Sequence, residues 1–189
     1  MKAFIKKYSH AWIFSYFIIY LIWFFWLEQR QVSEYVIVES ILDNKIPFCE
    51  VFIIPYFLWF LYLYFGVAYF FLKDRKEFYK LAAMMTIGLT ICLIIYTVWP
   101  NMQVLRPEVM IRKNIFTNIL GWLYRFDTPT NVCPSIHIYA SLVIHAAVIK
   151  SKHFVNNKHI RYGSAILCIC ICASTVFLKQ HSILDVVYA

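Results

Sequence analysis

Residues 51–72 read VFIIPYFLWFLYLYFGVAYFFL, a stretch without a single charged side chain. A helix needs about 20 apolar residues in a row to cross the hydrocarbon core of a bilayer, and this stretch is long enough. A soluble domain would have to cover so much apolar surface with charged residues, which the stretch does not supply. It therefore indicates a membrane-spanning helix and decides the class of fold.

Other apolar runs lie on either side of this stretch, at residues 11–27, 81–99, 134–149 and 160–178. The first run follows lysines, as a signal peptide does. Because it is rich in Trp and Tyr and has no small-residue cleavage site, we expect a retained anchor. Residues 182–189 begin one more apolar helix, too short within this sequence to cross a bilayer. The sequence thus predicts an all-α, polytopic membrane helix bundle, a single integral membrane domain with five full spans and a truncated sixth.

The composition supports a membrane protein. Of the 189 residues, 62% are hydrophobic and 15% are charged. The formal net charge of +8 lies in short loops beside apolar runs, where basic residues orient spans and contact anionic lipid headgroups. No basic stripe with interleaved aromatic residues marks a nucleic-acid-binding module. Membrane lipids are therefore the expected partners, nucleic acid is not, and the oligomeric state stays open.

The loops alternate in charge along the chain. Residues 28–50 carry five acidic side chains against two basic ones, whereas residues 73–80 and 150–161 are basic. Positively charged loops stay on the cytoplasmic side of a membrane. We therefore expect the basic N-terminus and these two loops in the cytoplasm, with the protein in the plasma membrane. Residues 28–50, 100–133 and 179–185 then lie outside.

The outer segment 100–133 is long and not simply polar. Apolar side chains recur in it at helical spacing, namely Ile115, Phe116, Ile119, Leu120, Trp122, Leu123 and Phe126. This spacing predicts a short amphipathic helix that lies in the membrane interface.

Three polar clusters stand in this apolar sequence, and the predicted topology places all three on the outer face. Arg106 precedes a proline in the third outer segment, and Ser135 and His137 begin the fourth span. His181 and Asp185 follow the fifth span. Their common face favours a single site.

The residue types in these clusters suit phosphate chemistry. Ser135 is a good helix N-cap, and the free N–H groups beyond it, near His137, attract anions. His181 and Asp185 are four residues apart, so on a helix they share a face. A carboxylate bound to one ring nitrogen raises the basicity of the other, which makes a histidine nucleophile. Arg106 offers a planar fork of donors that fits phosphate oxygens, so the set predicts phosphoryl transfer without a metal.

The three clusters resemble the signature motifs of the type 2 phosphatidic-acid phosphatase superfamily, which are Lys-x6-Arg-Pro, Pro-Ser-x-His and Ser-Arg-x5-His-x3-Asp. They stand here as Trp99-x6-Arg106-Pro107, Pro134-Ser135-Ile136-His137 and Ser174-Thr175-x5-His181-x3-Asp185. The resemblance covers about the last half of the chain and implies six spans, a lipid phosphate as substrate and no cofactor. It implies His181 as a nucleophile that forms a phosphohistidine, Asp185 as its orienting partner and His137 as the general acid. Its implied phosphate ligands are Arg106, Ser135 and Ser174.

Two motif cations are replaced, one by Trp99 and the other by Thr175. Lys179, Arg112 and Lys113 are the candidates to supply the missing charge. A similar loss occurs in the branch that resembles inositol-phosphorylceramide and sphingomyelin synthases, which transfer a phospho-headgroup between lipids. The leading hypothesis is a phosphatase that acts on a lipid phosphomonoester or pyrophosphate, such as phosphatidic acid or a polyprenyl phosphate. Headgroup transfer is the alternative, and a non-catalytic lipid binder or transporter is a third hypothesis.

The remaining polar residues are interpreted as structural. His145 is expected to pack in the core, and Asp127 with Arg125 to lie at the surface rather than at the entrance of the site. Cys49 and Cys133 both fall in outer segments, which leaves a disulfide open, although a pair of free thiols is favoured. Because the last helix is short, we expect the 189-residue chain by itself to have weak activity or none.

Overall fold

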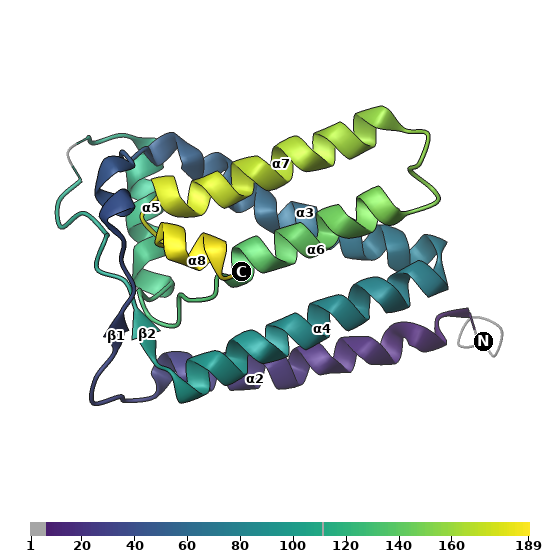
Figure 1. The fold of residues 1–189 in the computed structure, drawn as a ribbon, viewed down its shortest axis with the longest axis horizontal. Coiled ribbons are helices and arrows are strands. Elements are labelled where there is room, and N and C mark those ends of the chain that lie inside the picture. The colour runs from purple at the N-terminus through teal and green to yellow at the C-terminus, as the bar shows by residue number, and fades with distance from the viewer. Residues whose placement is uncertain (1–6, 111) are drawn as a thin grey trace.

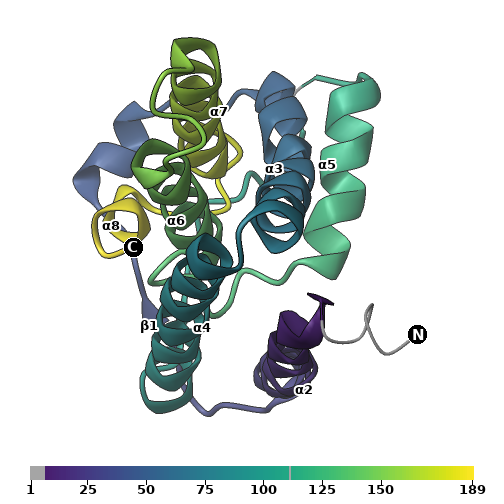
Figure 2. The same cartoon turned by 90° about the vertical axis from the view of Figure 1, so that its right-hand side faces the viewer.

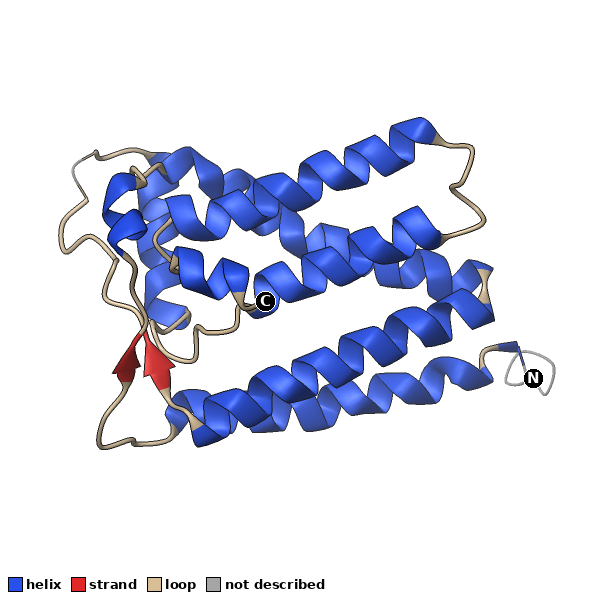
Figure 3. Ribbon diagram, viewed as in Figure 1, coloured by secondary structure: helices blue, strands red, loops and turns tan. Residues whose placement is uncertain are grey.

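A computed structural model of the chain describes residues 7–110 and 112–189, so the predicted cytoplasmic lysines Lys2 and Lys6 lie outside the described residues. Within the described residues the chain is mainly helical, with seven α-helices and a two-stranded sheet. The long helices run along the long axis of the molecule (Figures 1 and 3). The predicted helical class is therefore confirmed, whereas the sequence pattern gives no sign of the sheet.

Four helical segments of the described chain are long and apolar enough to cross a membrane. They are η1 with α2 (Ser9–Phe14 and Ser15–Gln29), η3 with α3 (Glu50–Phe52 and Ile53–Lys73), α4 (Arg75–Val98) and α7 (Lys158–Phe177). The apolar helix α6 (Ile136–Lys150) is shorter, with 15 residues, and α8 (Ile183–Val187) has five. The predicted spans at 11–27, 51–72 and 160–178 match their helices within two residues at each end.

Helix α4 begins six residues before the predicted span, at Arg75 rather than at residue 81. The carboxylate of Asp74 accepts hydrogen bonds from the backbone N–H groups of Lys76 and Glu77, at 2.9 and 3.1 Å. Such an N-cap starts a helix in polar sequence, before the apolar run begins. Hydropathy reports the apolar run alone and therefore misses this charged first turn.

Helix α6 lies in the middle of the bundle and packs against α3, α4 and α7, whereas α2 packs against α4. The hydroxyl of Tyr16 on α2 lies 2.8 Å from that of Thr90 on α4, and the indole N–H of Trp23 donates to Thr97 across 3.0 Å. The end-on view shows α2 beside α4 and apart from α3 (Figure 2). The hydrogen bonds thus hold α2 at the edge of the bundle.

The segments predicted to lie outside meet at one end of the molecule, and the two basic loops lie at the other end (Figure 1). At the first end, β1 (Val36–Ile37) pairs in parallel with β2 (Asn101–Met102). The short helix η2 (Ile41–Lys45) also belongs to this end, as does α5 (Ile115–Phe126). The predicted amphipathic helix is therefore present as α5, with Leu120 and Leu123 buried and Trp122 exposed.

Candidate active site

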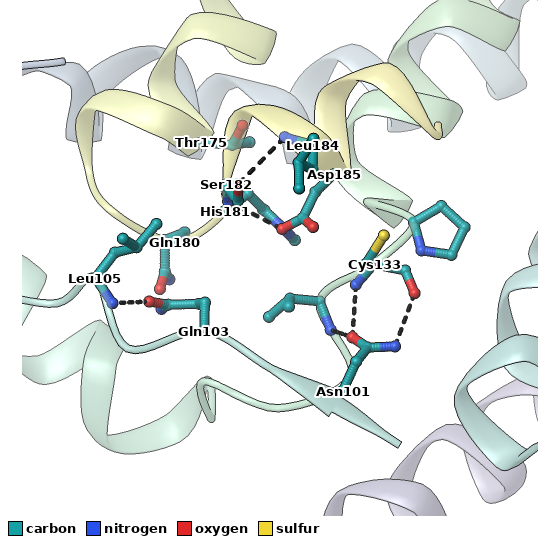
Figure 4. A network of polar contacts seen from close by, with 12 residues as sticks. Asn101, Gln103, Leu105, Cys133, Thr175, Gln180, His181, Ser182, Leu184 and Asp185 are labelled. Carbon is teal, nitrogen blue, oxygen red and sulfur yellow. Dashed lines mark hydrogen bonds and ion pairs between the residues drawn. The ribbon is translucent and has the colours of Figure 1, made fainter. Parts of the chain in front are cut away.

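His181 and Asp185 are in contact where the chain enters α8. Nδ1 of His181 lies 3.0 Å from Oδ2 of Asp185, and both side chains are buried (Figure 4). The contact predicted from the sequence is present. The predicted reason, a helical face shared by the two residues, is wrong, because His181 lies before the first residue of α8. Asp185 stands at the third helical position, where its carboxylate also accepts the backbone N–H of Ser182 across 3.0 Å. A capping box, rather than a shared helical face, therefore holds the carboxylate beside the ring.

A tight turn at the end of α7 presents His181 to the site. Lys179 has a positive φ of 55°, which reverses the direction of the chain. The backbone N–H groups of Gln180 and His181 both donate to the carbonyl of Thr175, at 2.9 and 3.0 Å. Hydrogen bonds of this kind satisfy the last carbonyls of a helix. The position of His181 is therefore tied to the rigid end of α7.

Asp43, from the segment between α2 and α3, anchors the same turn from the other side. Its buried carboxylate accepts the hydroxyl of Ser182 at 2.6 Å and the backbone N–H groups of Ser40 and Ile183 at 2.7 and 2.8 Å. The ammonium of Lys179 donates to the backbone carbonyl of Asp43 at 2.7 Å. Sequence reasoning missed this residue, because Asp43 lies outside every motif and nothing local links it to residue 182.

His137 faces His181 from the first turn of α6. The two ring centroids are 5.7 Å apart. Two aromatic rings of α3 pack against the imidazole of His137, with centroids 4.9 Å away for Tyr56 and 4.4 Å away for Trp59. The indole N–H of Trp59 donates to the backbone carbonyl of His137 at 3.1 Å. These contacts fix one imidazole opposite the other.

The segment that leads into α6 is held by Asn101, which is fully buried (Figure 4). Its side-chain oxygen accepts the backbone N–H groups of Val132 and Cys133, at 2.9 and 2.8 Å. Its amide nitrogen donates to the backbone carbonyl of Cys133 at 2.9 Å. Asn101 therefore fixes the position of the first turn of α6, and it too was missed from the sequence.

The two serines predicted to bind phosphate differ in the hydrogen bonding of their hydroxyl groups. Ser135 is the N-cap residue of α6, and its hydroxyl is buried with no partner in the described part of the chain. Its backbone N–H lies 3.4 Å from the carbonyl of Asp185, which places it beside the dyad. The hydroxyl of Ser174, by contrast, donates to the carbonyl of Ile171 within α7, at 2.6 Å. Ser135 thus has a free donor near the site, whereas the donor of Ser174 is occupied.

Arg106 is a fixed cation in the site. Its guanidinium lies over the ring of Tyr124, at 4.5 Å from the centroid, and donates to the carbonyl of Asp127 at 2.7 Å. It also donates to the side-chain oxygen of Gln180. Burial lowers the pKa of Arg106, and the charge of Asp127 opposes this shift. Because a guanidinium is not deprotonated in proteins, Arg106 keeps its charge at neutral pH.

Three cations were predicted from the sequence as further phosphate ligands, and the structure places them elsewhere. The ammonium of Lys179 donates to two backbone carbonyls, those of Asp43 and Ile46, at 2.7 and 2.6 Å. Arg112 pairs with Glu50 at 3.2 Å, and Lys113 is exposed. The three side chains lie outside the lining of the cavity that contains the two histidines.

That cavity has a volume of about 360 Å³ and opens between α2, α3 and α5. His137, His181 and Arg106 line it, and Arg106 is the only lysine or arginine among the described residues of its lining. A second cavity of about 350 Å³, lined almost entirely by apolar side chains, follows α2 and α3 deeper into the bundle. Tyr20, Trp59 and Ile136 line both cavities, so the apolar groove adjoins the polar site.

Asp127 lies in this cavity, so its predicted position at the surface, away from the site, is wrong. Its Oδ2 accepts hydrogen bonds from the hydroxyl of Tyr56 and from the amide of Gln180, at 3.1 and 2.7 Å. Arg125, two residues earlier, is exposed. The direction of the two side chains depends on how α5 ends, which the sequence does not reveal.

Other side chains take structural positions. Nδ1 of His145, which is half-buried, lies 2.9 Å from the hydroxyl of Ser164 on α7. Cys49 and Cys133 are both free thiols, as was favoured over a disulfide from the sequence. Burial raises the pKa of Cys133 to about 12, which keeps this thiol protonated at neutral pH.

No family model, curated protein or solved structure matches this chain. Its function is therefore inferred from the chemistry of the site. One imidazole is backed by a carboxylate, a second imidazole faces it, and a single guanidinium lies in the same cavity. This arrangement can supply a nucleophile, a proton donor and a charge for an anion.

Proposed function

We propose that this chain is an integral membrane enzyme that removes a phosphoryl group from a lipid phosphate through a phosphohistidine on His181. The observation that carries the proposal is the dyad of His181 and Asp185, 3.0 Å apart, with the ring of His137 5.7 Å from that of His181. The resemblance of the three motifs to lipid phosphatases agrees with this chemistry. The substrate is a phosphomonoester or pyrophosphate of a lipid.

In the first step, Nε2 of His181 attacks phosphorus and the bond from phosphorus to the lipid oxygen breaks. Asp185 accepts the hydrogen bond of Nδ1–H, which leaves Nε2 as the free nucleophile. His137 gives its proton to the departing oxygen. Arg106, the hydroxyl of Ser135 and the N–H groups at the start of α6 stabilise the charge on the equatorial oxygens. The products are a lipid alcohol and a phosphohistidine.

In the second step, water attacks the phosphohistidine. His137 accepts a proton from the water, the bond between phosphorus and nitrogen breaks, and inorganic phosphate leaves. Both histidines then return to their starting state. These steps use only groups of the chain itself, so we expect turnover in the presence of EDTA.

The proposal includes a position in the membrane. The candidate spans and α6 give five crossings, α8 is the beginning of a sixth, and α5 lies in the interface. The end that carries β1, β2 and α8 faces outward, and the basic loops face the cytoplasm of a plasma-membrane protein. The apolar groove between α2 and α3 then holds the hydrocarbon chains of the substrate while its phosphate reaches His181.

Headgroup transfer is the second candidate, and the charge of the cavity favours it. A dianionic phosphomonoester would meet one fixed cation, Arg106, in the described lining. A phosphodiester carries a single negative charge and needs fewer cations. In this variant a lipid hydroxyl replaces water in the second step, so that the phospho-headgroup passes to a second lipid.

The test is turnover of lipid phosphates in detergent micelles with EDTA, by the purified full-length protein, because the 189-residue chain by itself is expected to have weak activity or none. We expect release of inorganic phosphate, an acid-labile phosphoryl group on His181, and loss of both in the His181→Ala variant. His159→Ala, which changes an exposed histidine in the first turn of α7, is the matched control and should retain full activity. A new phospholipid in place of inorganic phosphate would assign the transferase. Substrate binding without turnover would assign the non-catalytic lipid binder or transporter.

A further inference from the structure

The two carboxylate oxygens of Asp185 differ in their partners, although the side chain is fully buried. Oδ2 lies 3.0 Å from Nδ1 of His181 and accepts the backbone N–H of Ser182, also at 3.0 Å. Oδ1 is buried as well, and it accepts no hydrogen bond of ordinary geometry from the described chain. A buried charged oxygen without a donor is destabilising, so a neighbouring group that can donate to Oδ1 acquires importance.

The thiol of Cys133 is such a neighbour. Figure 4 shows its sulfur turned toward the carboxylate of Asp185. The residue is 2% exposed, so no solvent separates the two groups from outside. Two residues further along the chain, the backbone N–H of Ser135 lies 3.4 Å from the carbonyl of Asp185, which holds the two segments together. A thiol is a weak donor, and S–H···O contacts of this kind contribute modestly to structure.

The thiol of Cys133 keeps its proton beside this carboxylate. Burial raises the pKa of Cys133 to about 12, and the charge of Asp185 and a hydrogen bond to it add to the shift. A thiolate here would place a second negative charge next to the first, which is unfavourable. The S–H group is therefore present as a neutral donor throughout the neutral pH range.

The backbone around Cys133 is fixed on both sides of the side chain. The side-chain oxygen of Asn101 accepts the backbone N–H of Cys133 at 2.8 Å, and the amide of Asn101 donates to its carbonyl at 2.9 Å. The hydroxyl of Tyr96 donates to the carbonyl of the next residue, Pro134. These bonds set the direction of the thiol. Cys133 is absent from the described lining of the histidine cavity, so the thiol acts on Asp185 and not on the substrate.

We propose that Cys133 is a positioning residue, whose thiol donates to Oδ1 of Asp185 and so fixes the carboxylate with Oδ2 toward His181. This inference rests on the proposed function of His181 and extends it to a residue that none of the three motifs contains. A carboxylate held at both oxygens cannot rotate away from Nδ1–H of His181. The tautomer that leaves Nε2 free for attack on phosphorus is then maintained.

The kinetic test compares variants of the full-length protein in detergent micelles with EDTA, with phosphatidic acid and a polyprenyl phosphate as substrates. We expect Cys133→Ala to reduce kcat by about three- to tenfold, the effect of one hydrogen bond to a charged group, and to leave KM unchanged. Cys133→Ser keeps a donor and should retain kcat within about twofold. Cys92→Ala, which removes a thiol of α4 that is also buried, is the matched control and should retain full kcat.

Two kinetic results would overturn the positioning role. One is an unchanged kcat in Cys133→Ala. The other is an equal loss in the alanine and serine variants, because a side chain that only fills space is not restored by a hydroxyl donor. A rise in KM in place of a fall in kcat would likewise contradict the role, since it would place Cys133 in contact with the substrate.

Infrared spectroscopy tests the hydrogen bond without turnover. The S–H stretching band of Cys133 is identified by its loss in Cys133→Ala, and it should move to higher frequency in Asp185→Asn, because a neutral amide oxygen is a weaker acceptor than a carboxylate. An unshifted band would refute the hydrogen bond, whether or not the enzyme turns over lipid. A shifted band without any His181-dependent turnover would instead refute the proposed function, and the positioning role with it, while confirming the bond itself.

Discussion

The hydroxyl of Ser182 donates a hydrogen bond to Oδ2 of Asp43 across 2.6 Å, although 139 residues separate the two. The backbone N–H of Ser182 donates to Asp185, and Asp185 contacts His181. A buried acid of the segment between α2 and α3 is thus two contacts away from the carboxylate that binds the candidate nucleophile. The first half of the chain contributes to the site through this connection as well as through α2 and α3.

Asp43→Asn should reduce kcat at least about tenfold, which corresponds to about 1.4 kcal/mol. The substitution replaces one acceptor oxygen with an NH2 group among the donors of Ser40, Ser182 and Ile183, which loosens the turn that carries His181. Turnover under saturating lipid measures the effect. Glu39→Gln, an exposed acid of the same segment, is the control. Equal turnover in both variants would show that Asp43 does not position the dyad.

Asp185→Asn should reduce kcat by about 10³ to 10⁴-fold, because an amide in place of the carboxylate favours the wrong tautomer of His181. Single-turnover formation of the phosphohistidine is the direct measurement. The variant is expected to stay folded, which its elution in size-exclusion chromatography checks. A rate within tenfold of the unmodified protein would remove Asp185 from the mechanism.

Ser135→Ala and Ser174→Ala should differ, although both serines belong to the predicted phosphate ligands. The buried hydroxyl of Ser135 has no partner in the described chain, whereas that of Ser174 donates within its own helix. We expect kcat/KM to fall by about tenfold for Ser135→Ala, the effect of one hydrogen bond to a charged group, and to change little for Ser174→Ala. The measurement is kcat/KM of both variants, taken from the turnover rate as a function of lipid concentration. The reverse order of effects would contradict the assignment of Ser135.

Arg106→Lys should reduce kcat/KM by about 10² to 10³-fold. Lysine keeps the charge but cannot reproduce the planar fork that contacts the backbone carbonyls of Asp127 and Thr128 and the side-chain oxygen of Gln180 together. Arg125→Lys changes an exposed arginine nearby and serves as the control. Full activity of Arg106→Lys would mean that a point charge is sufficient in the cavity.

Gly88→Ala should destabilise the bundle by about 1–3 kcal/mol through overpacking. A Cβ atom at this position would lie 1.9 Å from Cζ of Tyr139, whose hydroxyl is bound to the carbonyl of Met84 at 2.6 Å. Gly163→Ala, where no atom lies within 4 Å, should be neutral or stabilising because alanine favours the helix. Thermal unfolding in detergent compares the two. Equal melting temperatures would show that α4 and α6 can separate at this contact.

Part of the site could be predicted from the sequence because its members lie close together along the chain. His181 and Asp185 were paired by their spacing, yet the spacing argument assumed a helix at both positions. The capping box produces the same contact by another route. Asp127 was misplaced because its direction depends on the end of α5 and on Tyr56, which lies 71 residues away.

The sequence by itself determined the helical class, the extents of three of the four long apolar helices within two residues, and the three clusters that form the candidate site. These features follow from local rules, since hydropathy and helix periodicity depend on neighbouring residues. Only the tertiary structure decided that Lys179 binds backbone carbonyls instead of facing the cavity and that Asp43 anchors the turn before α8. Only it brought Glu28 and Asp127 to one cavity as well. These relationships join residues far apart in the chain, and their partners are selected by how the helices pack, which no local pattern encodes.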